Sequence, residues 1–284
     1  MYGYFIDRNY KGDLPYTDLA IERRRADTNV PGIEYQKRKI PIGCIERVKV
    51  STKSAAECIG RPLGIYDTIA TDRLDRLNSD ERIRLSDTLA DELGRITEES
   101  DIFPGRLLIA GLGNKNLTPD SLGTQAAEKV IATAHIKEYD PPLFRAQSCA
   151  EIVISTPGVA AESGMDAAVV IKGISDLIRP DAVIAIDAIA TRDIRRLGST
   201  IQVSNSGISP GSGLGNCHLA LCPETLGVPV IAIGLPTVID SRLLTDDDYP
   251  SEAMFVSPKE INEIISAASE VIGGAINRAF GIYP

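Results

Sequence analysis

Short apolar runs that alternate with helical patterns are the feature that most limits how this 284-residue chain can fold. These runs are rich in β-branched residues, and several are apolar on both faces, which is typical of strands in a covered parallel or mixed sheet. They lie at 106–110, 151–154, 182–186, 200–203 and 229–233. We therefore predict an α/β fold with a doubly wound, mostly parallel or mixed sheet flanked by helices.

Helical periodicity fills the segments around these strands. We expect helices at about 80–96, with Ser79 as a cap, at about 121–136 and at about 165–178. Another short helix is expected after Asp187.

The two ends of the chain differ in the strength of their patterns. The sequence Ser257-Pro258-Lys259-Glu260 matches a capping box with proline at the first helical position, and an apolar face follows it. Residues 1–75 are charged and rich in turn-forming residues, and they predict one strand at 45–50 and no strong helix. We expect this N-terminal part to pack on the α/β domain.

Composition excludes several classes of protein. The net charge of −9 disfavours binding to nucleic acid or anionic lipid. No apolar run approaches the ~20 residues of a membrane span, and no secretory signal is visible, so we expect a cytoplasmic protein. Five widely spread cysteines fit reduced thiols and match no zinc template, so we expect no metal or other cofactor.

The loop after the first of these strands carries a candidate catalytic acid, Asp120. Ligands of α/β sheets bind at the carboxyl ends of parallel strands, which is where this loop lies. Asn116 stands where a dinucleotide-binding motif needs its third glycine, so nucleotide binding is disfavoured. A cap of the following helix is an equally good interpretation of Asp120.

Two further carboxylates follow strands. Asp187 lies after the run 182–186, where apolar neighbours should desolvate it and raise its pKa, as suits a general acid. Asp240 follows the run 229–233 near the same edge of the sheet and could orient the other groups. Asp187 and Asp240 could each be a structural cap instead.

A loop of glycine and hydroxyl residues, 204–216, follows the fourth of these strands. Its amide groups could hold an anion or an extended peptide, and a flexible connection is the plain alternative. Gly211, Ser212 and Gly213 are its candidate binding residues.

The inventory of reactive groups favours paired carboxylates. The chain has two histidines, no Gly-x-Ser-x-Gly and no His-Glu-x-x-His, which argues against serine hydrolases and zincins. Two neighbouring acids can share one proton, so that one activates water while the other protonates the leaving group. A hydrolase using Asp120 and Asp187 is our hypothesis. The alternative is a metal-dependent hydrolase in which Asp120 and Asp187, with or without Asp240, hold a hard cation such as Mg²⁺ or Mn²⁺.

Several long motifs together resemble the germination protease family of endospore-forming bacteria. They occur in the family's order at 111–114 with 118–123, 180–190, 200–203 with 207–216, and 225–240. The resemblance implies an α/β fold related to hydrogenase-maturation endopeptidases, a homotetramer, and a catalytic pair of aspartates that match Asp120 and Asp187. Its implied substrates are the small acid-soluble spore proteins, degraded in the spore core during germination. Asn114 and Asp240 belong to the matching motifs, as supporting residues.

The resemblance also implies a self-processing zymogen. Members cut after an acidic residue, and Thr17-Asp18-Leu19-Ala20 looks like such a site, with the cut between Asp18 and Leu19. Residues 1–18 would then be a propeptide and 19–284 a single peptidase domain. The segment 241–256 is shorter than the family pattern, which bears on substrate docking and assembly. A non-catalytic sporulation protein on the same fold is the alternative from another class.

Overall fold

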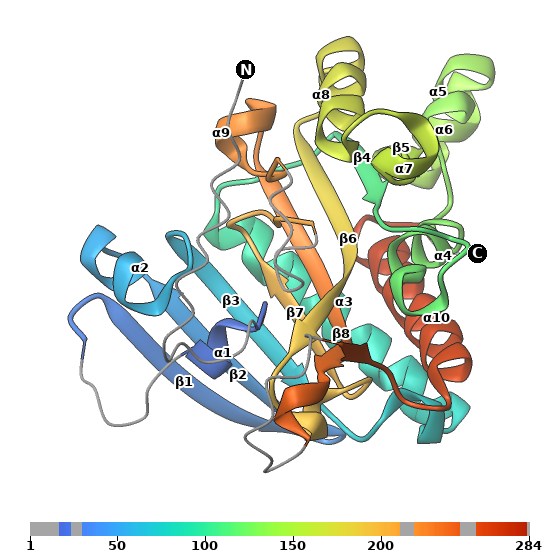
Figure 1. The fold of residues 1–284 in the computed structure, drawn as a ribbon. Coiled ribbons are helices and arrows are strands. Elements are labelled where there is room, and N and C mark those ends of the chain that lie inside the picture. The colour runs from blue at the N-terminus through green and yellow to red at the C-terminus, as the bar shows by residue number, and fades with distance from the viewer. Residues whose placement is uncertain (1–16, 24–29, 211–218, 245–253, 283–284) are drawn as a thin grey trace.

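A mixed sheet runs through the middle of the molecule and carries helices on both faces (Figure 1). The computed structural model describes residues 17–23, 30–210, 219–244 and 254–282. Within them the sheet has nine strands in the order β1-β2-β3-β7-β8-β6-β4-β5, with β9 paired to β8. The strands are β1 Ile33–Ile40, β2 Gly43–Val50, β3 Gly64–Ala70, β4 Arg106–Gly111, β5 Glu151–Ser155, β6 Ala182–Thr191, β7 Thr200–Ser204, β8 Val230–Asp240 and β9 Phe255–Val256.

The sheet has a parallel half and an antiparallel half. Strands β8, β6, β4 and β5 run parallel, whereas β7 pairs antiparallel with both β8 and β3, and β1 and β2 continue that pattern. The predicted mixed α/β sheet with flanking helices is therefore confirmed. The antiparallel β7 means that the loop following it begins at the opposite end of the sheet from the loops after β4 and β6.

Side-chain alternation explains which helix covers which face. In β6, Ile184 and Ile186 belong to the core beneath three helices, α3 (Ser79–Glu99), α4 (Leu122–Ala127) and α10 (Ile261–Ala279). Val183 and Ala185 point to the other face, toward α8 (Ala167–Ile178) and α9 (Pro223–Leu226). On that face the antiparallel half is covered by α1 (Ala20–Arg23) and α2 (Lys53–Ile59). Period-two alternation then places Asp187 on the same face as α8.

Strands β6 and β8 extend beyond their apolar cores. Strand β6 continues to Thr191 and β8 to Asp240, with a bulge in their pairing between Ile189 and Ala190. Asp187 thus lies inside a strand rather than after one, which corrects the prediction and removes its interpretation as a helix cap. The short helical turn that follows is capped by Asp193 instead.

Two helix starts differ from the sequence predictions. Helix α3 begins one residue earlier than expected, because Asn78 and Glu81 form a capping box through their side chains. Helix α10 begins at Ile261 with no side-chain cap, so the predicted capping box at Ser257 is wrong. The Glu260 carboxylate is engaged by Arg73 instead, at 3.1 Å.

The predicted helix at 121–136 is interrupted. Helix α4 ends at Ala127, and the chain resumes helical structure at α5 (Ala134–Tyr139), followed by α6 (Pro141–Gln147). Between α4 and α5, the amide of Ile131 donates to the Asn277 side chain and that of Thr133 donates to Ile152 in β5. These tertiary hydrogen bonds replace the helical ones. The remaining short helix is α7 (Ala160–Ser163).

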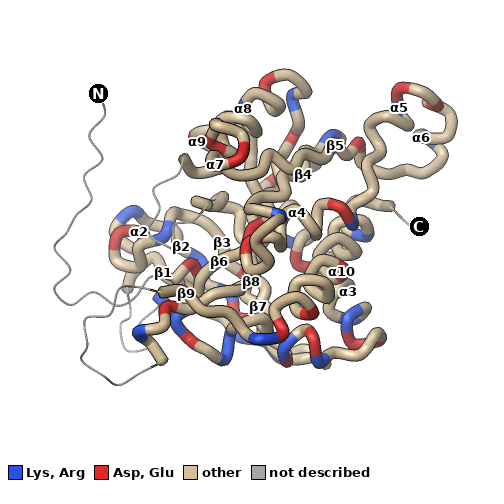
Figure 2. Tube along the Cα trace, turned by 45° about the vertical axis from the view of Figure 1, so that its right-hand side comes forward, with Lys and Arg blue, Asp and Glu red and all other residues tan. Residues whose placement is uncertain are grey.

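The N-terminal region contains more regular structure than the sequence predicts. The expected strand at 45–50 is β2, but β1 and β3 flank it and two short helices accompany them. Strand β1 is the charged sequence IEYQKRKI at the edge of the sheet, where exposure on both sides hides the alternation pattern. Acidic and basic positions are interspersed along the described chain (Figure 2).

No helix in the described ranges is both long enough and apolar enough to pass through a bilayer.

Candidate active site

Asp187 is held in the middle of the sheet with its side chain almost completely buried. Strand β6 lies between β4 and β8, and the exposed fraction of Asp187 is 4%. Its carboxyl group accepts a hydrogen bond from the amide of Ala188 at 2.9 Å. A carboxyl group in this position is shielded from water on all sides except the cavity that it lines.

Asp120 reaches the same place from a tight turn after β4. It ends the 3-10 helix η2 (Thr118–Asp120), and its carboxylate accepts from the amide of Asn114 at 2.7 Å. Gly113 has a left-handed φ of +96°, and a Cβ there would lie 2.0 Å from the Asp120 carbonyl oxygen. The turn therefore requires glycine at Gly113.

Helix α4 approaches β6 very closely just after Asp120. A Cβ added at Gly123 would lie 2.2 Å from the carbonyl oxygen of Ile186, the residue before Asp187. Gly111, opposite Ile186 in the β4–β6 pairing, is also crowded by the Gly123 backbone. Small residues at these contacts bring the Asp120 turn against the strand that carries Asp187.

The two aspartates line one cavity with a volume of about 510 Å³. Its lining also includes Asp18, Pro210 and Ser257. Pro210 belongs to the loop after β7, so that loop returns to the site although it starts at the far end of the sheet. Five segments that are far apart in the sequence, those of Asp18, Asp120, Asp187, Pro210 and Ser257, thus contribute to this cavity.

The environment separates the two carboxyl groups in acidity. Burial raises the pKa of Asp187 well above its usual value near 3.8, and the negative charges of Asp120 and Asp18 raise it further. Burial also raises the pKa of Asp120, while the hydrogen bond from the Asn114 amide opposes that shift. Asp187 consequently holds a proton more readily than Asp120, which is the acid–base division that the sequence suggested.

The segment that contains the predicted processing site lies in this site. The amide of Asp18 donates to the Ala190 carbonyl oxygen at 3.0 Å, and the Ala190 amide donates to the Asp18 carboxylate at 2.9 Å. Leu19 and Ala20 are fully buried against the antiparallel half of the sheet. Asp18 is therefore held against Ala190 of β6 by both its backbone amide and its side chain.

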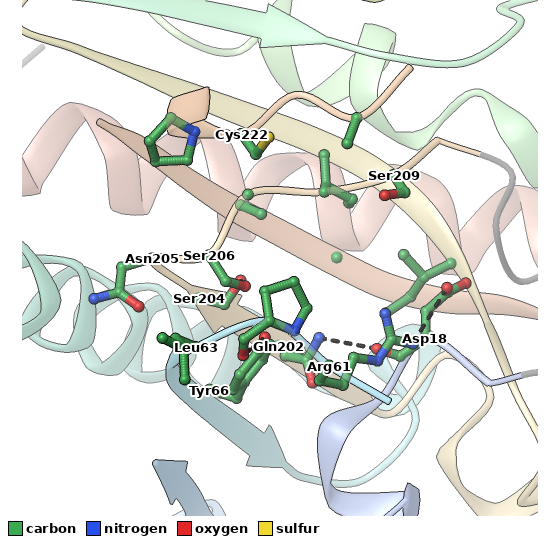
Figure 3. A pocket seen from close by; sticks show the side chains of 18 of the residues that line it. Asp18, Arg61, Leu63, Tyr66, Gln202, Ser204, Asn205, Ser206, Ser209 and Cys222 are labelled. Atoms are coloured by element: carbon green, nitrogen blue, oxygen red, sulfur yellow. Dashed lines mark hydrogen bonds and ion pairs between the residues drawn. The ribbon is translucent and has the colours of Figure 1, made fainter. Parts of the chain in front are cut away.

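Gln202 of β7 holds both sides of the bond between Asp18 and Leu19. Its side-chain amide donates to the Asp18 carbonyl oxygen at 3.3 Å and accepts from the Ala20 amide at 2.9 Å. Figure 3 shows Gln202, Asp18 and Arg61 facing one another at one end of a second cavity. This second cavity has a volume of about 370 Å³, and Asp18 and Ile189 line both cavities.

Glu22 anchors the chain just beyond this bond. Its carboxylate accepts from the Arg192 amide at 3.0 Å and from the hydroxyl groups of Thr17 and Thr191, and it pairs with Arg196 at 3.7 Å. These contacts fix the residues that follow Leu19 against the end of β6.

The other predicted site residues have separate outcomes. Asp240 does not line the cavity; it caps the turn after β8 and pairs with Arg242, which lowers the pKa of its carboxyl group. Asn114 contributes its backbone amide to Asp120. Gly211, Ser212 and Gly213 lie outside the described residues.

Asp240 does not join Asp120 and Asp187 in the cavity, so it is not a third ligand for the metal-dependent alternative. Within the described ranges, no three His, Cys, Asp or Glu side chains are grouped so that they could hold a metal ion.

Sequence reasoning missed Gln202 and Arg61. Gln202 lies between Ile201 and Val203, so its polar side chain in an apolar strand was a detectable signal. Arg61 follows helix α2 in a charged region, where one arginine does not stand out.

Comparisons with known proteins show the family of the chain. The family model for the germination protease matches residues 16–250. The chain belongs to the germination protease family. Membership makes it a peptidase, and the predicted family is confirmed.

Curated relatives carry the same description. A germination protease of Caldanaerobacter subterraneus subsp. tengcongensis is 39% identical over 81% of this chain and 71% of its own length. Those of Clostridium acetobutylicum and Bacillus subtilis are each 37% identical, over 93% and 82% of this chain and 94% and 66% of their own lengths.

A more distant likeness is to a solved structure, the [NiFe] hydrogenase maturation protease HycI from Thermococcus kodakarensis KOD1. It covers 64% of this chain and 97% of that chain at 20% identity, with a TM-score of 0.38. At that level it adds nothing to the family assignment.

Proposed function

We propose that this peptidase is the self-processing zymogen of a spore-germination endopeptidase that uses Asp120 and Asp187 as an acid–base pair. The observation that carries the proposal is the position of the Asp18–Leu19 bond. This bond is held by Gln202 and Ala190 beside a cavity that contains one carboxyl group favouring the protonated form and a second, more acidic one.

In the proposed reaction, Asp120 accepts a proton from a water molecule as its oxygen attacks the carbonyl carbon of Asp18. Negative charge develops on the carbonyl oxygen, to which the Gln202 amide already donates. Asp187 gives its proton to the nitrogen of Leu19 as the carbon–nitrogen bond breaks. The products are the carboxyl group of Asp18 and the amino group of Leu19. Asp120 now carries the proton taken from water, and transfer of this proton to Asp187 restores the starting state of the pair.

The same site would act on substrates in trans once residues 1–18 have left. The contact between Asp18 and Ala190 of β6 marks where a substrate residue would bind, and the cavity beside Asp187 has room for further substrate side chains. By family membership we assign small acid-soluble spore proteins as the substrates and the spore core as the place of action.

The proposed enzyme also assembles as a homotetramer. Support comes from apolar side chains that the single chain leaves exposed, including Val169 and Leu177 on α8, with exposed fractions of 53% and 83%. Sedimentation equilibrium of the purified chain measures this directly; a monomer at micromolar concentration would contradict it.

The function is tested by incubating the purified full chain alone and with a small acid-soluble spore protein. Intact mass spectrometry should record the loss of residues 1–18, followed by cleavage of the added protein after acidic residues. A chain that stays intact and leaves the substrate intact would contradict the proposal and favour a non-catalytic role. Loss of cleavage with a chelator, restored by Mg²⁺ or Mn²⁺, would contradict the metal-free pair and favour the metal-dependent alternative.

A further inference from the structure

Arg61 lies directly against the residue that precedes the proposed cleavage point. One of its guanidinium nitrogens lies 3.5 Å from the Asp18 carboxylate and also donates to the Thr17 carbonyl oxygen. The exposed fractions of the two side chains are 17% for Arg61 and 13% for Asp18. Their interaction is thus shielded from solvent, which strengthens it relative to a surface ion pair.

The local fold holds Arg61 in a fixed position. Helix α2 ends at Gly60 in a left-handed conformation, and the Arg61 amide donates back to Ala56 at 3.2 Å. Pro62 follows, and its carbonyl oxygen accepts from the Tyr66 hydroxyl at 2.8 Å. The side chain therefore enters the site from a capped helix end rather than from a loose loop.

The charge around the site gives Arg61 a particular importance. Among the described residues that line the two cavities, it is the one Lys, Arg or His, whereas Asp120 and Asp187 lie on the other side of Asp18. An acidic substrate residue entering this site would be repelled by the Asp120 carboxylate, which is the ionised member of the proposed pair. The Ala190 amide and the Arg61 guanidinium offset that repulsion by binding the Asp18 carboxylate.

Arg61 also has a hydrogen-bond donor to spare. Its Nε atom is buried and has no hydrogen-bond partner among the described residues. A buried guanidinium donor without an acceptor lowers the stability of a folded protein, which argues against a purely structural role for Arg61.

We propose that Arg61 is the specificity-determining residue of this protease: together with the Ala190 amide, it selects an acidic side chain on the N-terminal side of the cleaved bond. This inference rests on the proposed endopeptidase function and extends it to substrate choice. Substrates in trans would place their acidic residue where Asp18 lies in the full chain.

The test is a double-mutant cycle on trimming of the full chain, with the variants Arg61→Met, Asp18→Asn and their combination. Arg61→Met should slow cleavage of the Asp18–Leu19 bond by about 10- to 100-fold, the effect of losing a charged hydrogen bond. The same change should have almost no effect in a chain that already carries Asp18→Asn. Arg61→Lys should restore part of the rate, because it returns the positive charge.

A second readout uses the trimmed enzyme on two short peptides that differ only in aspartate or asparagine before the cut. The ratio of their kcat/KM values should fall by about 10- to 100-fold in Arg61→Met. If Arg61→Met slows cleavage of both peptides equally, or slows trimming equally with and without Asp18→Asn, the role of Arg61 is purely structural. That result would overturn this inference but not the proposed function. A wild-type chain that cleaves nothing would overturn the proposed function and, with it, the role of Arg61.

Discussion

The negative charge of Asp18 raises the pKa of Asp187, and both residues line one cavity. The proposed cut changes this relationship, because it releases Asp18 and leaves a positive amino group on Leu19. The electrostatics of the proposed catalytic pair therefore differ before and after processing.

We predict that removing the Asp18 charge lowers the pKa of Asp187, since one of the two charges that oppose its ionisation is lost. Carboxyl-carbon NMR titration of Asp187 measures this in chains kept intact by Asp120→Asn, with and without Asp18→Asn. Identical titration curves would show that the Asp18 charge does not act on Asp187.

Replacing Asp187 with asparagine should make the protein more stable at neutral pH. Because the folded-state pKa of Asp187 lies above its ordinary value near 3.8, ionisation favours the unfolded state as the pH rises through this interval. The advantage of Asp187→Asn should be small near pH 4 and grow toward the raised pKa, by roughly 1.4 kcal/mol for each pH unit. Urea unfolding at several pH values measures it.

The matched control for that series is Asp91→Asn on the exposed face of α3. Its stability should follow the wild type at every pH. A pH-independent difference between Asp187→Asn and the wild type would contradict the raised pKa.

Gly123 should tolerate no side chain. In Gly123→Ala, the new Cβ meets the Ile186 carbonyl oxygen and the Leu112 backbone, so α4 must move away from β6. Overpacking of this kind costs about 1–3 kcal/mol, and the displacement should also slow trimming because it separates Asp120 from Asp187.

Gly94→Ala in α3 is the corresponding control, since nothing lies within 4 Å of its added Cβ. It should raise stability by about 0.5–1 kcal/mol through helix propensity and leave trimming unchanged. Thermal unfolding and intact mass measure both effects. Equal behaviour of the two alanine variants would contradict the close packing at Gly123.

Gln202→Met should slow trimming while preserving the fold. Methionine keeps the length of the side chain but removes both hydrogen bonds to residues 18 and 20. Loss of a donor to the carbonyl oxygen of the reacting bond costs about 100-fold in rate in comparable sites. Gln36→Met on the exposed edge strand β1 is the control. If the Gln202→Met chain trims at the same rate as the Gln36→Met chain, Gln202 has no part in the mechanism.

The parallel half of the sheet, and Asp120 and Asp187 as candidate site residues, could be predicted from the sequence because each leaves a local signal in it. Buried strands such as 182–186 are continuous apolar runs, and an acid next to such a run, as at Asp187, is conspicuous. In the antiparallel half, β2 and β7 were predicted but β1 and β3 were not. Strand β1 is charged and lies at the exposed edge, and β3 has Asp67 and Thr68 buried in the middle of its apolar run.

The remaining differences come from tertiary contacts that no local pattern encodes. Asn277 and β5 interrupt the helix predicted at 121–136 through hydrogen bonds formed across the molecule. Likewise, Arg61 and Gln202 become neighbours of Asp18 only when β3 pairs with β7, more than a hundred positions away in the sequence.

The most direct test of the account is the intact mass of freshly purified Asp120→Asn, Asp187→Asn and Asp91→Asn chains after incubation, each also mixed with a small acid-soluble spore protein. The account predicts that the first two keep residues 1–18 and leave the substrate whole, while Asp91→Asn loses residues 1–18 and cuts the substrate like the wild type. Trimming and cutting at wild-type rates by either Asp120→Asn or Asp187→Asn would contradict the carboxylate pair.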